Sequence, residues 1–328
     1  MSRTGEATTV SVVVTTYNHE RYIGETIRSL LAQTYRPAEI IVVNDGSTDG
    51  TAAAVRAFGN QVRLVDQANA GVAGARNAGV RVATGELVAF IDGDDLWDTH
   101  KLAIQVEAFN QFPEAGLIVA DVDHFSDADV LWSGQLHMNF FATGETRLRL
   151  FPAYDRLVAG NFINTTSQVM APRRVLEEVG PSDAQFPLAS DYDLYLRIAE
   201  RYPLVLVDRV LAHWRYVRTS ASGPMHSRRF RWDADMFSVL RKHQRAANEQ
   251  RRRLIADALQ TRIADTSKFA YYHGSQGQRR WATSYLARLA MQYHSRSAAA
   301  YLIGLWTPSS LKRVVSSVGR VPSARETM

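Results

Sequence analysis

Strand-like and helix-like patterns alternate along the first 120 residues, and this alternation constrains the fold more than any other feature of the chain. Val10–Thr15 reads VSVVVT, a β-branched run that is typical of a strand buried on both faces. Four further strand-like runs follow it: Glu39–Val43, Gln61–Val65, Glu86–Ile91 and Gly116–Ala120. Residues with helical apolar spacing separate these runs, at Glu20–Gln33, Asp49–Phe58, Val72–Ala83 and Thr99–Phe112. Repeated strand–helix units predict an α/β domain whose mostly parallel sheet has helices on both faces.

The pattern changes after about residue 121. We predict, in chain order, a hairpin, a helix, a strand, a helix and a strand-rich stretch, at Val130–Phe141, Thr146–Ala159, Ser167–Ala171, Asp191–Tyr202 and Leu204–Val217. From Arg228 onward the pattern is mainly helical, with interruptions near Gly274–Gln278 and at Pro308. The chain is therefore expected to have two parts, an α/β domain over residues 1–225 and a basic, mainly helical extension over residues 226–328.

Charge is distributed unevenly between these two parts. Residues 1–225 carry 19 basic and 27 acidic side chains, a net charge of −8, whereas residues 226–328 carry 19 basic and 6 acidic side chains, a net charge of +13. A basic segment of this kind favours an anionic surface or an anionic substrate. The chain has no cysteine, which excludes disulfides and thiolate metal sites.

No part of the sequence predicts passage through a membrane. The polar segment Met1–Thr9 does not have the pattern of a secretory signal. No apolar run approaches the roughly 18 residues that a spanning helix needs. The default reading of the basic segment is a solvated helix face over an apolar stripe that packs on the α/β domain. Ala298–Trp306 reads AAAYLIGLW and is followed by basic residues, and the alternative reading of this part is an amphipathic anchor on anionic lipid. We expect a cytoplasmic protein, or one that is peripheral at the inner face of the membrane.

An acidic cluster, Asp92-Gly93-Asp94-Asp95, directly follows the fourth predicted strand. Ligands of open α/β sheets bind beyond the carboxyl ends of the strands. Three carboxylates in four residues repel one another unless a cation or a hydrogen-bonded shell stabilises them. Hard oxygen ligands suit Mn²⁺ or Mg²⁺, and a diphosphate would complete the coordination. The alternative is a turn whose aspartates cap the next helix.

Three other polar motifs lie at predicted strand ends. Thr15-Thr16-Tyr17-Asn18 follows the first strand, Asn44–Asp49 with Asp45 follows the second, and Asn69–Asn77 with Arg76 joins the third strand to a helix. Tyr17 suits stacking on a base, Asp45 suits hydrogen bonds from a base or ribose, and Arg76 suits a phosphate. Each motif can also be read as an ordinary helix entry. Their glycine spacing matches neither a dinucleotide fingerprint nor a P-loop.

These four motifs, in this order, resemble the family-2 glycosyltransferases, which have the GT-A (Rossmann-like) fold, and the resemblance covers about residues 9–220. It implies that one group of residues holds the donor nucleotide: Thr15, Thr16, Tyr17, Asn18, Asp45, Asn69, Arg76 and Asp92. It implies that Asp94 or Asp95 ligates the metal directly. Proline is frequent in the family at the position of Thr15, and we interpret this departure as a variation of the backbone.

The resemblance also implies a catalytic base. Ser190-Asp191-Tyr192-Asp193-Leu194 matches a family pattern in which Glu-Asp precedes a helix, with Asp191 at the catalytic aspartate and Ser190 at the glutamate. An inverting transfer needs a carboxylate that takes the proton of the acceptor hydroxyl. A simple helix cap is the alternative reading. The family's later Tyr-Arg-x-His element has Val217 at the histidine position.

The sequence therefore predicts an inverting glycosyltransferase that uses a nucleotide diphosphate sugar, with UDP as the expected carrier and dTDP as the second choice. A carbohydrate or a lipid-linked saccharide is the expected acceptor, in the synthesis of bacterial surface polysaccharide or glycoconjugate. Nucleic acid is not expected as a partner, since no nucleic-acid-binding module is recognised. The alternatives are a nucleotidyltransferase, a non-catalytic nucleotide- or glycan-binding protein, and a peripheral membrane adaptor built on the basic segment.

Overall fold

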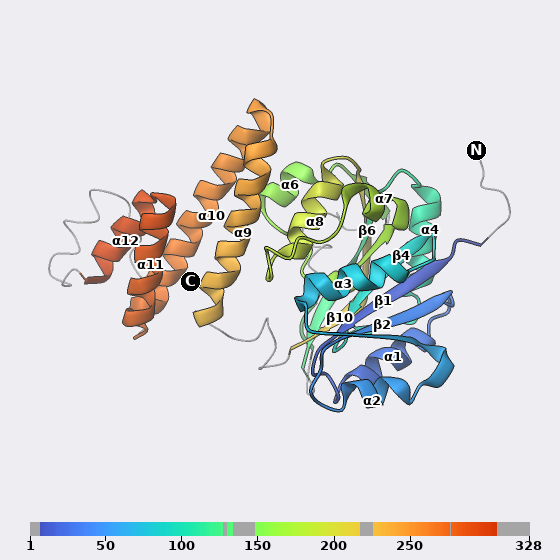
Figure 1. Ribbon diagram of the computed structural model, residues 1–328. Coiled ribbons are helices and arrows are strands. Elements are labelled where there is room, and N and C mark those ends of the chain that lie inside the picture. Colours follow the sequence, from blue (N-terminus) through green and yellow to red (C-terminus); the bar gives the residue numbers. More distant parts are fainter. Residues whose placement is uncertain (1–6, 127–129, 134–147, 217–225, 276, 307–328) are drawn as a thin grey trace. The chain divides into compact units, whose positions relative to one another are not determined.

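The computed structural model describes residues 7–126, 130–133, 148–216, 226–275 and 277–306 (Figure 1). Contacts within the chain divide it into two compact units, Met1–Gly223 and Pro224–Met328, which are described separately below. The functional division of the chain between residues 225 and 226 stays a prediction.

The N-terminal unit is built on one mixed sheet, which has ten strands within the described residues. The order along the sheet is β3-β2-β1-β4-β9-β6-β10-β5, with β7 on β6 and β8 on β10. The first half, β1 (Val10–Thr16), β2 (Glu39–Asp45), β3 (Arg63–Gln67) and β4 (Leu87–Asp92), is parallel, as predicted. The second half mixes directions and contains β5 (Leu96–Trp97), β6 (Leu117–Phe125), β7 (Val130–Ser133), β8 (Leu148–Phe151), β9 (Val169–Pro172) and β10 (Leu204–Arg215).

Apolar side chains fix the helices on this sheet. Within the described residues, the helices of the unit are α1 (Ile23–Leu31), α2 (Thr51–Arg56), α3 (Gly71–Val82), α4 (Lys101–Gln111), α6 (Tyr154–Ala159), α7 (Arg173–Val179) and α8 (Ser190–Ala199). All of β1 is buried, and Ile23, Ile27 and Leu30 of α1 are buried at helical spacing. A Cβ on Gly79 of α3 would lie 2.2 Å from Cγ1 of Val13. Glycine therefore allows α3 to approach β1 closely.

Several predicted elements differ from the structure. The helix predicted over Thr146–Ala159 is wrong in its first half, because residues 148–151 form β8, which pairs antiparallel with β10. Leu148 and Leu150 alternate along this strand and pack against the core, so a period of two prevails over helical spacing. The strand predicted at Ser167–Ala171 begins later, after a 3₁₀ turn, η2 (Thr166–Gln168). Of the hairpin predicted at Val130–Phe141, β7 is present, and residues 134–141 lie outside the described residues.

The C-terminal unit is helical, as predicted. It contains α9 (His226–Ala246), α10 (Glu249–Ser275), α11 (Arg279–Tyr293) and α12 (Arg296–Trp306). Ile255, Leu259 and Ile263 of α10 are buried, as are Leu286 and Leu289 of α11. The interruption predicted near Gly274–Gln278 separates α10 from α11, whereas Pro308 lies outside the described residues.

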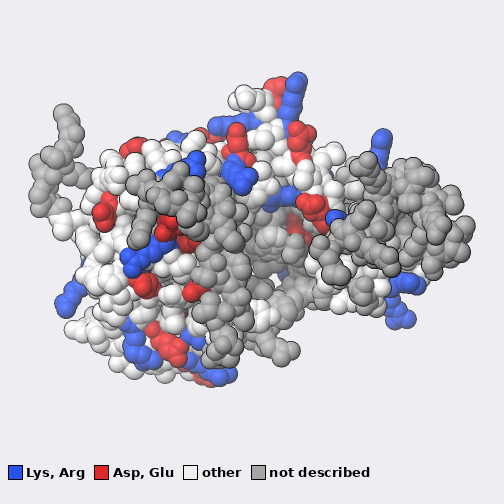
Figure 2. Space-filling view, turned by 180° about the vertical axis from the view of Figure 1, so that it is seen from behind, with Lys and Arg blue, Asp and Glu red and all other residues white. Residues whose placement is uncertain are grey.

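Two structural observations concern the predicted contact with a membrane. In the described chain, no helix combines the length and the apolar character that crossing a bilayer requires. On the face drawn in Figure 2, basic and acidic side chains are interspersed over much of the coloured surface. Contact with a membrane surface therefore stays a prediction.

Candidate active site

The motifs chosen from the sequence lie at one edge of the sheet. In the parallel ladder, Thr15 of β1 is opposite Val43 of β2 on one side and Asp92 of β4 on the other. Asp45 is the last residue of β2, and Asp92 is the last residue of β4. The carboxyl ends of these strands therefore bring the polar motifs together, which is the position expected for a ligand in an open α/β sheet.

Hydrogen bonds join the loop after β1 to the loop after β2. Asn18 has a left-handed backbone (φ 56°); its N–H donates to Ser47 Oγ at 2.9 Å, and its Oδ1 accepts from the Thr48 N–H at 2.8 Å. Glu20 Oε2 accepts from the Gly50 N–H at 2.6 Å. Tyr17, between these contacts and the strand, is 47% exposed. The two loops therefore form one rigid base from which the Tyr17 ring is available to a ligand.

Asp45 is fixed by the segment that leads into α3. Its Oδ1 accepts from Gln67 Nε2 at 2.7 Å and from the Ala70 N–H at 2.8 Å, and the residue is only 4% exposed. Gly46 has a positive φ of 74°, and a Cβ there would lie 2.8 Å from the backbone nitrogen of Asn69. Asn69 itself is exposed. Asp45 thus orients the turn that presents Asn69 and the start of α3.

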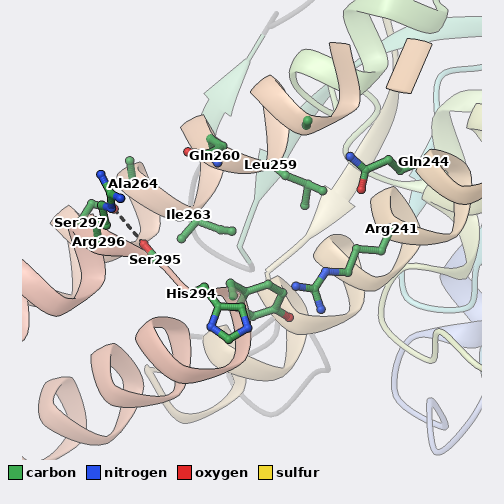
Figure 3. A pocket seen from close by; sticks show the side chains of 12 residues that line it. Arg241, Gln244, Leu259, Gln260, Ile263, Ala264, His294, Ser295, Arg296 and Ser297 are labelled. Atoms are coloured by element: carbon green, nitrogen blue, oxygen red, sulfur yellow. Dashed lines mark hydrogen bonds between the residues drawn. The ribbon is translucent and has the colours of Figure 1, made fainter. Parts of the chain in front are cut away.

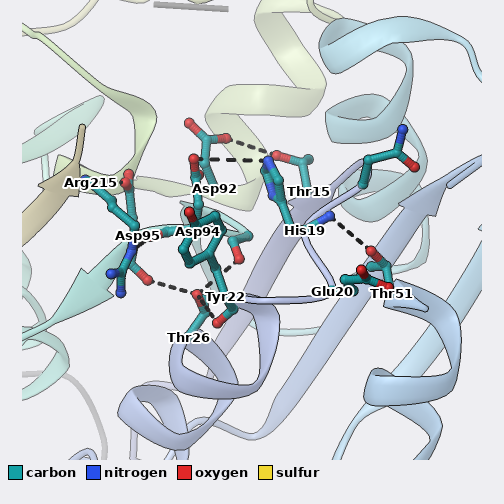
Figure 4. A network of polar contacts seen from close by, with 12 residues as sticks. Thr15, His19, Glu20, Tyr22, Thr26, Thr51, Asp92, Asp94, Asp95 and Arg215 are labelled. Carbon is teal, nitrogen blue, oxygen red and sulfur yellow. Dashed lines mark hydrogen bonds and ion pairs between the residues drawn. The ribbon is translucent and has the colours of Figure 1, made fainter. Parts of the chain in front are cut away.

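Asp92 is held by hydroxyl groups on both sides. Thr15 Oγ1 donates to Asp92 Oδ1 at 2.9 Å (Figure 4), and Thr166 Oγ1 donates to Oδ2 at 3.4 Å. The Asp92 N–H donates to Ser167 Oγ at 3.1 Å. Asp92 is nevertheless partly exposed. Its carboxylate is therefore oriented by neutral donors and still accessible.

Asp95 points into the protein. It has no exposed surface, and Ser167 Oγ donates to its Oδ2 at 2.5 Å, with Thr165 Oγ1 at 3.4 Å from the same oxygen. Its Oδ1 accepts from the Arg215 N–H at 3.0 Å. Burial, with the charges of Asp94 and Asp92, raises the pKa of Asp95 well above its ordinary value. Both oxygens of Asp95 are therefore used inside the protein.

Asp94 lies between a histidine and an arginine. Its Oδ2 is 3.9 Å from Nε2 of His19, and its backbone oxygen accepts from Nε of Arg215 at 2.9 Å. Arg215 also pairs with Oε2 of Glu25 at 2.6 Å. Burial raises the pKa of Asp94, and the charge of His19 opposes this rise. A Cβ on Gly93 would lie 2.7 Å from Thr16 Oγ1 and 2.9 Å from His19 Nδ1, so glycine allows the acidic loop to lie against both residues.

Helix α8 brings Asp191 and Tyr195 to the same site. Burial raises the pKa of Asp191 above its ordinary value, whereas the positive charge of Arg76 opposes the rise and the charge of Asp92 adds to it. Burial and the charge of Asp191 raise the pKa of Tyr195 well above its ordinary value, so this hydroxyl keeps its proton. Asn77, next to Arg76, exchanges two hydrogen bonds with the backbone of Ser182, both within 2.9 Å. This pair joins α3 to the segment that leads into α8.

Four buried polar atoms around this edge have no hydrogen-bond partner in the described part of the chain: Thr16 Oγ1, His19 Nδ1, Arg76 Nη1 and Tyr195 Oη. Buried polar atoms of native proteins are nearly always paired. Two of these residues neighbour the acidic loop, and the other two neighbour Asp191 electrostatically. Their unpaired atoms are suited to groups of a bound molecule.

Sequence reasoning missed part of this site. His19 lies one residue beyond a motif that we singled out, so its position was a usable signal. Thr166 and Ser167 lie about 75 residues after Asp92 in the chain, so no local pattern links them to it. Tyr195 has the spacing of an apolar helix face and therefore did not stand out as a site residue. Arg215, two positions before Val217, binds the acidic loop and Glu25. Val217 and Arg218 lie outside the described residues.

The donor atoms present fit a hard divalent cation only in combination with a substrate. Among the described residues, no group of three His, Asp or Glu side chains is arranged to hold a metal. Mg²⁺ commonly takes one or two carboxylates and completes its shell with phosphate oxygens and water. The accessible carboxylate of Asp92 and that of Asp94 meet this requirement. Asp95 does not, because it has no exposed surface and both of its oxygens accept hydrogen bonds inside the protein.

Known proteins resemble this chain in sequence. Residues 11–180, just over half of the chain, match the family model described as Glycosyl transferase family 2. An uncharacterized glycosyltransferase of Nostoc sp. is 36% identical over 180 residues, which are 53% of this chain and 54% of that protein. Another from Rickettsia conorii is 28% identical over 214 residues, which are 64% of this chain and 34% of that protein. The matches thus span about half or less of these relatives.

Solved structures resemble it in fold. Residues 1–349 of TarS from S. aureus superpose with a TM-score of 0.62 at 18% identity, covering 94% of this chain and 86% of that chain. The mannosyltransferase PcManGT of Pyrobaculum calidifontis superposes with a TM-score of 0.55 at 21% identity, covering 95% of this chain and 86% of that chain. These similarities establish the GT-A fold. On the match over residues 11–180, the chain belongs to glycosyl transferase family 2.

Proposed function

We propose that this glycosyltransferase moves a sugar from a nucleotide diphosphate donor to a hydroxyl acceptor in a single displacement that inverts the anomeric centre. The observation that carries this reading is the set of unpaired buried atoms beside Asp92, Asp94 and Asp191. Two solved structures of similar fold support the donor class: TarS in complex with UDP-GlcNAc, and the mannosyltransferase PcManGT in complex with GDP-Man and Mn²⁺. We expect UDP as the carrier, with dTDP as the alternative.

The donor nucleotide would bind along the loops after β1, β2 and β3. The exposed ring of Tyr17 suits stacking on the base, and the loop that Asp45 orients suits contacts with base and ribose. Arg76 is 4% exposed and has an unpaired Nη1, which suits a charge-assisted hydrogen bond to the diphosphate. The proposed donor-binding residues are Thr15, Thr16, Tyr17, Asn18, Asp45, Asn69, Arg76 and Asp92.

Asp94, with Asp92, would hold the divalent cation, Mn²⁺ or Mg²⁺. When bound, such an ion stabilises the negative charge that develops on the leaving diphosphate. Asp95 has a different part in this proposal. Because its carboxylate joins Ser167 to the backbone of Arg215, it fixes the backbone of the acidic loop and thereby the direction of the Asp94 side chain.

Asp191 would act as the base. The acceptor oxygen forms a bond to the anomeric carbon, the bond from that carbon to the diphosphate oxygen breaks, and the hydroxyl proton passes to the Asp191 carboxylate. Burial raises the pKa of Asp191, which strengthens this carboxylate as a base, and the charge of Arg76 favours its ionised form. Tyr195 keeps its proton and has no partner among the described residues, so it can donate to a sugar oxygen.

The acceptor is proposed from the family resemblance and from the basic segment. We propose a carbohydrate or lipid-linked saccharide, in the synthesis of bacterial surface polysaccharide or glycoconjugate. The proposed location is the cytoplasm, with peripheral contact at the inner face of the membrane. The net charge of +13 over residues 226–328 supports attraction to anionic lipid.

The test is nucleoside diphosphate release from a panel of nucleotide sugars, with and without Mn²⁺. We expect metal-dependent release from one donor, and a loss of roughly a hundredfold or more in Asp94→Ala. Asp98→Ala is the matched control, because Asp98 Oδ1 accepts from the His100 N–H just before α4 and takes no part in the proposed site. Absence of both release and thermal stabilisation by every donor would refute a nucleotide-sugar donor.

A further inference from the structure

The C-terminal unit contains a groove of about 690 Å³ that none of the roles above uses. It lies between α9, α10 and the junction of α11 with α12, so all of its walls belong to one unit (Figure 3). His294, at that junction, has a left-handed backbone with φ of 50°. This turn ends α11 and directs Ser295 and Arg296 back toward the groove.

The floor of the groove is formed by one face of α10 and is apolar except for one side chain. Ala256, Leu259, Ile263 and Ala264 line it together with the polar Gln260, since residues spaced by three, four, seven and eight positions share a helix face. Figure 3 shows Leu259 and Ile263 extending from α10 toward the side on which Arg241 and His294 lie. An aliphatic chain that lies along this face would be removed from water, which favours binding.

The rim of the groove is cationic. Arg241 contributes from α9 and Arg296 from the start of α12, and no Asp or Glu is among the lining residues. The Arg241 guanidinium lies 4.4 Å from the centre of the Tyr293 ring, and its Nη2 donates to the backbone oxygen of Gln292 at 3.3 Å. Within the described chain, neither arginine forms an ion pair with a carboxylate. The lining of the groove therefore carries net positive charge, and the acidic groups that act on Tyr293, Asp233 and Asp235, lie outside this lining.

One hydroxyl in the groove lacks a partner. Tyr293 Oη is buried and has no hydrogen-bond partner in the described part of the chain. Burial raises the pKa of Tyr293, Arg241 opposes the rise, and Asp233 and Asp235 add to it, so the hydroxyl keeps its proton. Beside the Arg241 guanidinium it offers a neutral donor next to a charged one, which is a good arrangement for a phosphate oxygen.

We propose that this groove binds the phosphate ester of an amphiphile, with the phosphate on Arg241 and Tyr293 and the aliphatic chain along Leu259 and Ile263. Arg296 adds positive charge at the rim. A free phosphate would use only the rim and a neutral lipid only the floor, so the two together favour a phosphorylated lipid. Binding here does not depend on the donor reaction, and its failure would leave nucleotide-sugar chemistry untouched.

The test is calorimetric titration of the full chain with decyl phosphate below its micellar concentration. Inorganic phosphate, decyl maltoside and decanoate are titrated in parallel. We expect decyl phosphate to bind at one site at least roughly tenfold more tightly than the other three. Arg241→Gln should weaken it by roughly tenfold and Tyr293→Phe by a smaller factor. Arg245→Gln, on the same helix but exposed and outside the groove, should change it less than about twofold.

Binding is compared only among variants whose melting temperature matches that of the wild type. Ala264→Phe fills part of the floor without changing the charge and should also weaken binding of decyl phosphate. Equal losses in Arg241→Gln and Arg245→Gln would overturn the proposal in favour of general charge attraction. If inorganic phosphate binds as tightly as decyl phosphate, the apolar floor has no part in binding; if decanoate does, the phosphate has none. Either result would overturn the proposal. A folded wild type that binds none of the four ligands would also refute it.

Discussion

Two neighbouring regions of the sheet edge treat their polar groups in opposite ways. In the loops after β1 and β2, backbone donors of Asn18, Thr48 and Gly50 reach side-chain acceptors of the facing loop. Around the end of β4 and the start of α8, four buried polar atoms have no partner within the described residues, and burial raises the pKa of Asp94 and Asp191. The hydrogen bonds between the two loops need no ligand, whereas the second region, which Thr16 and His19 reach from β1 and the loop after it, has unpaired atoms that suit a ligand.

The first region therefore has the properties of a support, and the second has those of a reaction site. A loop whose hydrogen bonds are made internally keeps its shape before the substrate arrives, which lowers the entropy cost of binding. Buried groups without partners destabilise the folded protein unless a ligand pairs with them. Both the stability of the first region and the chemistry assigned to the second can be measured.

The largest effect is expected from Asp191→Asn. The amide keeps the shape of the side chain but does not take a proton, so sugar transfer should fall by roughly 10²–10⁴-fold. Donor binding, followed by thermal stabilisation with the nucleotide sugar, should persist. If transfer falls less than about tenfold, Asp191 is not the base, and the raised pKa reflects burial alone.

Asn18→Ala tests the hydrogen bonds that join the loops after β1 and β2. The change removes the hydrogen bond to the Thr48 N–H and places alanine at φ 56°, so the free energy of unfolding should fall by about 1–2 kcal/mol. Asn18→Gly should recover the part that comes from the backbone. Equal losses in the two variants, measured by denaturant titration, would assign the whole effect to the side chain.

Two tyrosines of α8 provide a matched pair. Tyr192 Oη donates to the Leu157 backbone oxygen at 2.9 Å, whereas Tyr195 Oη has no partner in the described chain. Tyr192→Phe should therefore lower the free energy of unfolding by about 1 kcal/mol and leave transfer unchanged. Tyr195→Phe should leave stability unchanged and slow transfer by up to roughly tenfold. A reversed pattern would contradict the division between the two regions.

The smallest change is expected in the pH profile of Arg76→Gln. The Arg76 charge lowers the pKa of Asp191 against the effect of burial, so its removal should raise that pKa further. A carboxylate that must be ionised to act loses activity as the pH falls through its pKa. The acid limb of the profile, normalised to its plateau, should therefore move to higher pH. An unmoved limb would mean that another group controls it.

The first half of the fold was readable from the sequence because its signals are local. The β-branched runs of β1 and β2 are buried throughout or nearly so, and parallel strands bring their carboxyl-end motifs together without further information. The hydroxyls of Thr166 and Ser167 were not readable, because they meet Asp92 and Asp95 through a turn some 75 residues away. β8 was missed because its register is set by β10.

The acidic cluster shows the same limit at the scale of single residues. The sequence identified three carboxylates but did not distinguish Asp94 from Asp95. In the structure Asp95 is fully buried, whereas Asp94 faces His19. Their different environments depend on Ser167 and Arg215, which belong to other parts of the chain, so the distinction arises only with the tertiary fold.

The hydroxyl of Thr15 has a consequence for how the Asp92 carboxylate tolerates substitution. Proline, frequent in the family at this position, has no side-chain donor, whereas Thr15 Oγ1 here donates to Asp92 Oδ1 at 2.9 Å. Thr15 is therefore a second tether for this carboxylate beside Thr166. If either hydroxyl is removed, the other still holds one carboxylate oxygen, so the two positions are partly redundant although 151 positions separate them in the chain.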